Sequence, residues 1–220
     1  MIEQQPFPCQ RIPPLRIHHL LAWMTVTAVL ISVSLWFDRT ARNGPPIENQ
    51  VIAGSLMLGA IAIAGAWTCV GWGVSWRRQG FAFPKNPGDW LLTIVAVSTI
   101  AVVAELIGVF VAFFIEEDLL AIYYPLAGLA LLAIWLLLNF RGIKHYADTV
   151  AWRVVFGAMM VLGITTAFNV STNLIVGALL CLAWAVWSDL RNRIARGWTH
   201  WFGVVVAMSL GIAAIGAFGF

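Results

Sequence analysis

The sequence predicts an all-α integral membrane protein, a single-domain bundle of about seven transmembrane helices. Of its 220 residues, 61% are hydrophobic and 10% are charged, whereas a soluble domain carries about 25% charged residues. Because so few polar side chains cannot cover a surface that faces water, lipid has to be the main solvent. The apolar residues form long runs without the alternating polarity of a membrane β-barrel.

Seven apolar segments follow one another, and we expect each to be a helix because lipid offers backbone groups no hydrogen-bond partner. The first segment is longer than the apolar region of a typical signal peptide, so we interpret it as a span. The stretch "AFNVSTNLIVG" separates the fifth segment from the sixth and favours a tight turn, with a broken or re-entrant helix as the alternative. The predicted spans are approximately 17–37, 51–75, 90–115, 119–140, 151–168, 173–188 and 201–220.

The loops between these segments predict the orientation. Arginine and lysine residues concentrate before the first span and in the loops that follow the second, fourth and sixth spans. The loops at the other end are less basic and include the acidic stretch 116–118. The positive-inside rule therefore places the N-terminus in the cytoplasm, and a bacterial inner (plasma) membrane is the expected location. Most of the 12 tryptophans map to the same end, where we expect an interfacial aromatic belt.

Glu105 is an acid within the apolar run "TIAVVAELIGVFVAFF". Its helix face carries Ser98 and several small residues, a pattern that favours close packing against another helix. A charged side chain at this depth costs at least about 2.5–3.5 kcal/mol, and no basic residue of the predicted spans lies at its level. Two interpretations follow. Glu105 is a neutral acid that bridges helices through hydroxyls such as those of Ser98 and Ser209, or it binds a proton or cation in a transport path.

The histidines map to the predicted cytoplasmic end of the bundle. We interpret them as solvated interfacial side chains, and haem held by His18, His19 or His200 is the alternative. No other cofactor is evident. The sequence contains neither the GxSxG motif of a serine hydrolase nor the HExxH motif of a zinc protease. We therefore assign no catalytic and no metal-ligating residue, and we expect a protein that is not an enzyme.

The segment "DLRNRIARGW" at 189–198 combines apolar residues every four positions with arginines between them. This pattern predicts a basic amphipathic extension of the sixth span that lies among anionic lipid headgroups, or a surface that docks a partner protein. A second basic pair follows the second span at the same end. The arginines assigned to these contacts are Arg191, Arg193, Arg196, Arg77 and Arg78.

These patterns together predict a non-enzymatic multi-pass membrane protein, a structural or accessory subunit that binds a partner complex, lipid or itself. Small residues along the second and seventh spans favour close helix packing, either within the bundle or in a homo- or hetero-oligomer. We expect no nucleic-acid partner. The alternative function is a small proton- or cation-coupled transporter or channel that uses Glu105.

Overall fold

The computed structural model describes residues 17–41, 50–115, 117–146, 149–166 and 172–218. Within these ranges the chain forms seven helices, and each predicted segment lies on a helix of its own. The helices are α1 (Ile17–Ala41), α2 (Gln50–Arg78), α3 (Pro87–Ile115), α4 (Glu117–His145), α5 (Val150–Thr166), α6 (Thr172–Arg191) and α7 (Trp198–Phe218).

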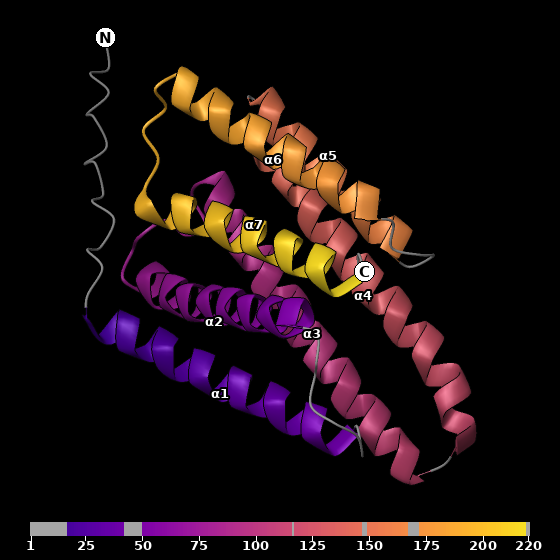
Figure 1. Cartoon of the computed structure of the whole chain (residues 1–220). Coiled ribbons are helices and arrows are strands. Elements are labelled where there is room, and N and C mark those ends of the chain that lie inside the picture. Colours follow the sequence, from indigo (N-terminus) through magenta and orange to yellow (C-terminus); the bar gives the residue numbers. More distant parts are fainter. Residues whose placement is uncertain (1–16, 42–49, 116, 147–148, 167–171, 219–220) are drawn as a thin grey trace.

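Consecutive helices run in opposite directions (Figure 1). The start of α1 meets the end of α2, where the rings of His19 and Trp72 lie 4.2 Å apart. The start of α5 likewise meets the end of α6, where Trp152 bonds to Asp189. The segment between α5 and α6, for which the sequence favours a tight turn, lies largely outside the described residues. The two helices themselves are antiparallel neighbours.

Helices α3 to α7 form a closed ring in which α3 contacts α4, α4 contacts α5, α5 contacts α6, α6 contacts α7, and α7 returns to α3. The α1–α2 hairpin packs on the outside of this ring, because α2 lies against α3 and α7 (Figure 1). One apolar core lies within the ring around Trp152 and Phe156. A second core, around Ala66 and Leu92, lies between α2, α3 and α7. Helix α7 therefore contributes to both cores.

Tryptophan side chains join the helices in chain order. The indole N–H of one tryptophan on each of α1 to α5 donates a hydrogen bond to the next helix. These bonds run from Trp23 to the carbonyl of Ile61 (3.2 Å), from Trp67 to the hydroxyl of Thr99 (2.6 Å), from Trp90 to the carbonyl of Leu138 (3.0 Å), from Trp135 to the carbonyl of Met159 (2.8 Å), and from Trp152 to the carboxylate of Asp189 (3.1 Å). These five indoles are thus interhelical bridges, while Trp184 and Trp187 are exposed, as an interfacial belt requires.

Two glycines let the first turns of α3 and α7 touch through their backbones. A methyl group on Gly88 would overlap the carbonyl of His200, and one on Gly203 would overlap the carbonyl of Gly88. Because the obstructing atoms belong to the backbone, no rotamer change could relieve either overlap. Glycine at both positions therefore fixes the approach of α3 to α7.

The expected amphipathic extension of the sixth span is wrong, because α6 ends at Arg191. Arg193 has a φ of 51°, and the N–H groups of Arg193 and Ile194 donate to the carbonyls of Leu190 and Asp189. These two bonds form a Schellman cap, which closes a helix and turns the chain away. The same cap ends α2, with Gly80 at the left-handed position.

Five helices are long and apolar enough to cross a membrane, by length and composition: segments within α2, α3, α4, α6 and α7. The described apolar parts of α1 and α5 are shorter, at His19–Ser32 and Val150–Ile164. Large apolar side chains such as Leu129 and Leu180 are exposed on the outside of the bundle, as contact with lipid requires. The chain is thus a helical integral membrane protein.

Candidate functional site

A buried polar cluster, which consists of Trp152, Asp189, Arg196 and His200, joins α5, α6, α7 and the loop between the last two. Arg196 forms a two-pronged ion pair with Asp189, with distances of 3.0 Å from Nε to Oδ2 and 3.2 Å from Nη2 to Oδ1. The side chain of Asp189 is fully buried and that of Arg196 is 14% exposed. Charges so far from water need such a partner, because desolvating an isolated ion costs several kcal/mol.

His200 extends the buried polar cluster to α3. Its Nδ1 accepts a hydrogen bond of 2.9 Å from the backbone N–H of Gly88. A nitrogen that accepts cannot carry a proton, so the imidazole is neutral and its hydrogen sits on Nε2. That nitrogen lies 3.6 Å from Oδ2 of Asp189, which is too long for a good hydrogen bond. The cluster therefore ties α5, α6 and α7 to the first turn of α3.

Asp89 caps α3 beside this cluster. Its Oδ2 accepts hydrogen bonds from the backbone N–H groups of Asn86 (2.9 Å) and Lys85 (3.1 Å), in the manner of a capping box. Burial, and secondly the negative charge of Asp89, raise the pKa of Tyr146 well above its ordinary value, against an opposing effect of Arg196. Tyr146, at the end of α4, thus remains a neutral phenol close to a carboxylate.

The sequence suggested that the histidines are solvated interfacial side chains. This interpretation is wrong for two of them. His19 and His200 are buried, whereas His145 is exposed. His19 packs on Trp72, and His200 belongs to the buried polar cluster, so the two have different neighbours. The side chain of His18 lies outside the described residues. Within the part of the chain that the structure describes, no group of three or more histidine, cysteine or acidic side chains is arranged to hold a metal ion.

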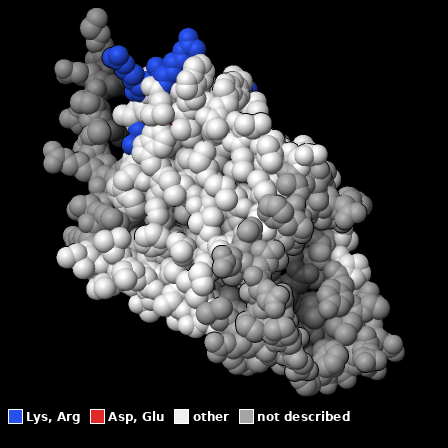
Figure 2. Space-filling model, in the orientation of Figure 1, with Lys and Arg blue, Asp and Glu red and all other residues white. Residues whose placement is uncertain are grey.

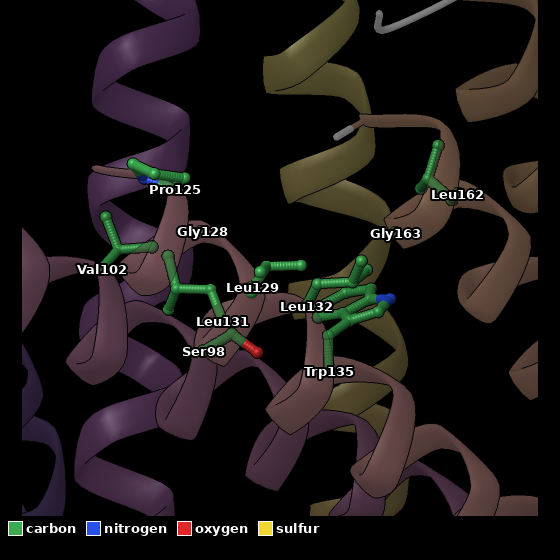
Figure 3. Close-up of a pocket in the computed structure, with 10 residues that line it drawn as sticks. All are labelled: Ser98, Val102, Pro125, Gly128, Leu129, Leu131, Leu132, Trp135, Leu162 and Gly163. Carbon is green, nitrogen blue, oxygen red and sulfur yellow. The ribbon is translucent and has the colours of Figure 1, made fainter. Parts of the chain in front are cut away.

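A groove with a volume of about 650 Å³ lies between α3, α4 and α5 (Figure 3). Its walls are almost wholly apolar, and Trp135 stands across it toward α5. Gly163 allows this position of the indole, because a methyl group there would overlap the Trp135 ring. The lining residues are Ser98, Val102, Pro125, Gly128, Leu129, Leu131, Leu132, Trp135, Leu162 and Gly163.

A second cavity, of about 280 Å³, lies inside the ring of helices α3 to α7. Ser98, Trp135 and Leu162 line both the groove and this inner cavity, so the two meet at these side chains. The Oγ atom of Ser98 is buried and has no hydrogen-bond partner among the described residues. The hydroxyl is therefore enclosed by protein atoms between the two apolar spaces.

The structure places one member of the predicted Glu105 polar site in this groove, namely Ser98. Ser209 is on α7 and lines neither the groove nor the inner cavity. The backbone of Glu105 is part of α3, but its side chain lies outside the described residues. The polar contacts predicted for Glu105 therefore stay a prediction.

The basic residues singled out in the sequence lie at the end of the bundle that holds the buried polar cluster, which we call the basic end. On the face shown in Figure 2, Lys and Arg atoms gather at this end and the rest of the described surface is uncharged. Arg77, Arg78, Arg191 and Arg193 are exposed there. Arg196 differs from them, because its guanidinium is engaged by Asp189.

Sequence reasoning did not single out Asp89, Asp189 and Trp152. Asp89 carries a local signal, because "NPGD" places a cap residue, a proline and an acid at the start of a helix. Asp189 carries a weaker sequence signal, because it is an acid at the end of an apolar run. Their partners come from other helices, and the sequence pattern gives no sign of which ones.

Comparison with protein-family models, curated proteins and solved structures found no match.

Proposed function

We propose that this chain is a non-enzymatic, seven-span protein of a bacterial inner membrane, and that its groove between α3, α4 and α5 holds the hydrocarbon chain of a lipid. The observation that carries the proposal is the groove itself. Its volume of about 650 Å³ lies within the roughly 300–1,000 Å³ typical of sites for small ligands. Its lining calls for an apolar ligand.

The surroundings of the groove identify the occupant. Leu129 of α4 lines the groove and is more than half exposed on the outside of the bundle, so the groove opens toward the bilayer. Water in such a space would lose hydrogen bonds, because Ser98 is the only lining residue with a polar side-chain oxygen. A lipid hydrocarbon chain enters from the bilayer without that loss. A lipid held there would equip the protein to act as an accessory subunit that recruits or senses lipid.

Gly128 provides a direct test, because a methyl group on it would meet no atom within 4 Å. The variant Gly128→Leu places a side chain at the wall of the groove, and we expect it to leave the fold intact. The matched control is Gly71→Leu on α2, where the added carbon also meets nothing. We expect native mass spectrometry of the purified protein to show lipid on the wild type and on the Gly71 variant, and much less on the Gly128 variant. Equal lipid retention by all three would refute the proposal.

The basic end supports the orientation with the N-terminus in the cytoplasm. Arg191 lies 5.0 Å from the ring centre of Trp187, and Lys144 lies 5.0 Å from that of Phe140, so cations and exposed aromatic rings share the headgroup level. Each exposed arginine adds about 1 kcal/mol of attraction to an anionic surface. Replacing Arg191 and Arg193 by glutamine should therefore lower retention of anionic lipid. Cysteines placed at Lys85 and Asp118, which lie on opposite sides in this topology, should be labelled from opposite sides of the membrane, and labelling of both from outside the cell would contradict the seven-span topology.

A second candidate function is a proton or cation pathway through Glu105, and the free hydroxyl of Ser98 favours it. Residues 98 and 105 are seven apart and therefore share one face of α3. Glu105→Gln keeps the shape of a neutral acid but cannot release a proton. A proton carrier would lose flux in vesicles with this change and keep its stability. A neutral acid that only bridges helices would show no flux in either form, and its infrared carboxyl band would not titrate near pH 7.

A further inference from the structure

The inner cavity within the ring of helices is too large to be a gap in ordinary packing. Its volume is about 280 Å³, whereas the interiors of proteins contain few voids larger than a water molecule. All five helices from α3 to α7 contribute residues to its wall. An empty space of this size would deprive the surrounding side chains of van der Waals contacts, so the cavity calls for an occupant.

The wall of the inner cavity offers water no partners. Among the residues that line it, only Ser98, Thr99 and Trp135 carry a side-chain oxygen or nitrogen. The Ser98 oxygen exposes almost no surface. The Thr99 hydroxyl accepts from the indole of Trp67 at 2.6 Å and donates within its own helix at 2.8 Å. The Trp135 indole donates to a carbonyl of α5 at 2.8 Å. A buried water needs two to four partners, so the occupant has to be apolar.

The size of the inner cavity fits a short hydrocarbon segment. An apolar cavity of about 150 Å³ in another protein stays dry and holds a benzene molecule. The inner cavity is almost twice as large, so it has room for roughly ten carbon atoms. In a membrane, the abundant groups of this chemistry are the hydrocarbon chains of the lipids.

The inner cavity and the groove share part of their walls. Ser98 of α3, Trp135 of α4 and Leu162 of α5 line both spaces (Figure 3). Each of the three helices that form the groove therefore contributes one residue to the boundary. Side chains can turn to other rotamers while the helix backbone stays in place, so a boundary of this kind can open.

Trp135 is the largest residue of this boundary, and one hydrogen bond holds its indole. The indole N–H donates to the carbonyl of Met159. Within α5 that carbonyl also accepts the N–H of Gly163, four residues further on. A turn of the indole would therefore leave no carbonyl without a partner. The ring lies against α5 because Gly163 has no side chain, and a methyl group there would overlap it. Trp135 thus has the position and the attachment of a movable partition.

We propose that the inner cavity is the second compartment of the lipid site: the hydrocarbon chain in the groove passes Trp135, and its end lies inside the ring of helices. This inference rests on the proposed lipid site in the groove. It describes the ligand more closely, as a chain long enough to occupy both spaces. Trp135 then selects for chain length, because a chain that ends in the groove leaves the indole in place.

Photolabelling of the wild-type protein locates the two parts of the chain. The protein is reconstituted in phosphatidylglycerol vesicles that contain a lipid with a diazirine either in the middle or at the end of one acyl chain, and mass spectrometry identifies the labelled residues. Leu132 lines the groove, whereas Leu182 lines the inner cavity and is 2% exposed. We expect the middle label on Leu132 and the end label on Leu182. Leu180, which is 65% exposed on the same helix as Leu182, should take both labels.

The labelling pattern separates the two proposals. An end label that reaches Leu132 but not Leu182 would overturn the second compartment and leave the lipid site of the groove intact. Absence of both labels from Leu132 would instead refute the lipid site of the groove, and with it the second compartment.

A variant that fills the inner cavity provides a matched comparison. Ala178→Phe adds a benzene ring to a residue that lines the cavity, and Ala183→Phe adds the same ring to an exposed position of the same helix. We expect the Ala178 variant to lose most of the end label on Leu182 and to keep the middle label on Leu132. The Ala183 variant should keep both. Equal end labelling of Leu182 in the two variants would contradict the proposal.

Two further measurements identify the source of the hydrocarbon and its route. A free alkane with a diazirine serves as the probe for a separate small molecule, and labelling of Leu182 by this alkane but not by the end-labelled lipid would overturn the proposal. Trp135→Phe removes the indole hydrogen bond and keeps an aromatic ring. After mixing with the end-labelled lipid, this variant should acquire label on Leu182 several-fold faster than the wild type, whereas Trp184→Phe, at an exposed position, should not. Equal rates for all three proteins would contradict the role of Trp135.

Discussion

The basic end and the groove are built in opposite ways within one ring of helices. At the basic end, the ion pair between Asp189 and Arg196, the bond from Gly88 to His200 and the backbone contact at Gly203 hold the helices together. At the groove, α3, α4 and α5 leave about 650 Å³ between apolar side chains. At the basic end, directional bonds fix how the helices pack. At the groove, apolar side chains leave a space that we propose bilayer lipid fills.

This difference shows where sequence changes should matter for stability. In lipid, apolar side chains gain no hydrophobic free energy by packing against one another, because the hydrocarbon around them is equally apolar, so association depends on close van der Waals packing and interhelical hydrogen bonds. Interhelical bonds and close backbone contacts therefore contribute most of the specificity. We expect substitutions at the basic end to destabilise the bundle and substitutions in the groove to change mainly what it binds.

The largest effect is expected for Asp189→Ala. It leaves the guanidinium of Arg196 without its partner and removes the acceptor of Trp152, and breaking a buried ion pair on one side costs about 3–5 kcal/mol. The free energy of unfolding in detergent measures this loss. The double variant Asp189→Ala, Arg196→Leu removes the stranded charge and should recover part of it. A loss below about 1 kcal/mol would show that the pair behaves as a solvated surface pair.

Gly88→Ala should follow, with a loss of about 3 kcal/mol, at the upper end of the range for overpacking. The added methyl overlaps the carbonyl of His200, and relief requires α3 to move away from α7. Gly71→Ala is the control, because its methyl meets no atom within 4 Å. It should be neutral or gain up to about 1 kcal/mol from helix propensity. Equal thermal melting of the two variants would contradict the backbone contact.

Arg193→Gly should stabilise the protein by about 1 kcal/mol, because Arg193 holds a left-handed conformation that costs a non-glycine residue about this much. Gly80 already occupies the equivalent position after α2. The reciprocal change, Gly80→Ala, should destabilise by a similar amount. Chemical unfolding measures the free energy of unfolding of both variants. Destabilisation by Arg193→Gly would mean that the arginine side chain contributes more than its conformation costs.

The smallest effect on stability is expected in the groove, where Gly128→Leu should change the free energy of unfolding by less than about 0.5 kcal/mol. The first carbon of the added side chain meets no atom within 4 Å, and we expect the rest of it to extend into the groove. The same variant should show the largest loss of bound lipid. A destabilisation as large as that of Gly88→Ala would mean that the groove is already filled by protein contacts, which would remove the contrast between the two regions.

The number and placement of the helices followed from the sequence. Composition and run length require lipid-embedded helices, because an apolar segment of about 20 residues satisfies its backbone in no other way. The basic segments likewise gathered at one end, as the loop charges predicted. The amphipathic extension of the sixth span was predicted from the four-residue spacing of Leu190, Ile194 and Trp198. The prediction was wrong because Arg193 adopts a left-handed backbone conformation that ends the helix, and the spacing gives no sign of it.

The partners of the polar side chains followed only from the tertiary structure. Helices that are apolar on nearly every side carry no periodic stripe to show which face packs inward. Arg196 therefore had the same sequence signature as Arg191 and Arg193, although it pairs with Asp189. Four of the five bridging tryptophans, all except Trp135, likewise had the signature of an interfacial belt. The sequence by itself determined which segments are apolar helices, because that depends on local composition. The tertiary structure decided which polar groups are bonded and where the groove lies, because both depend on neighbours distant along the chain.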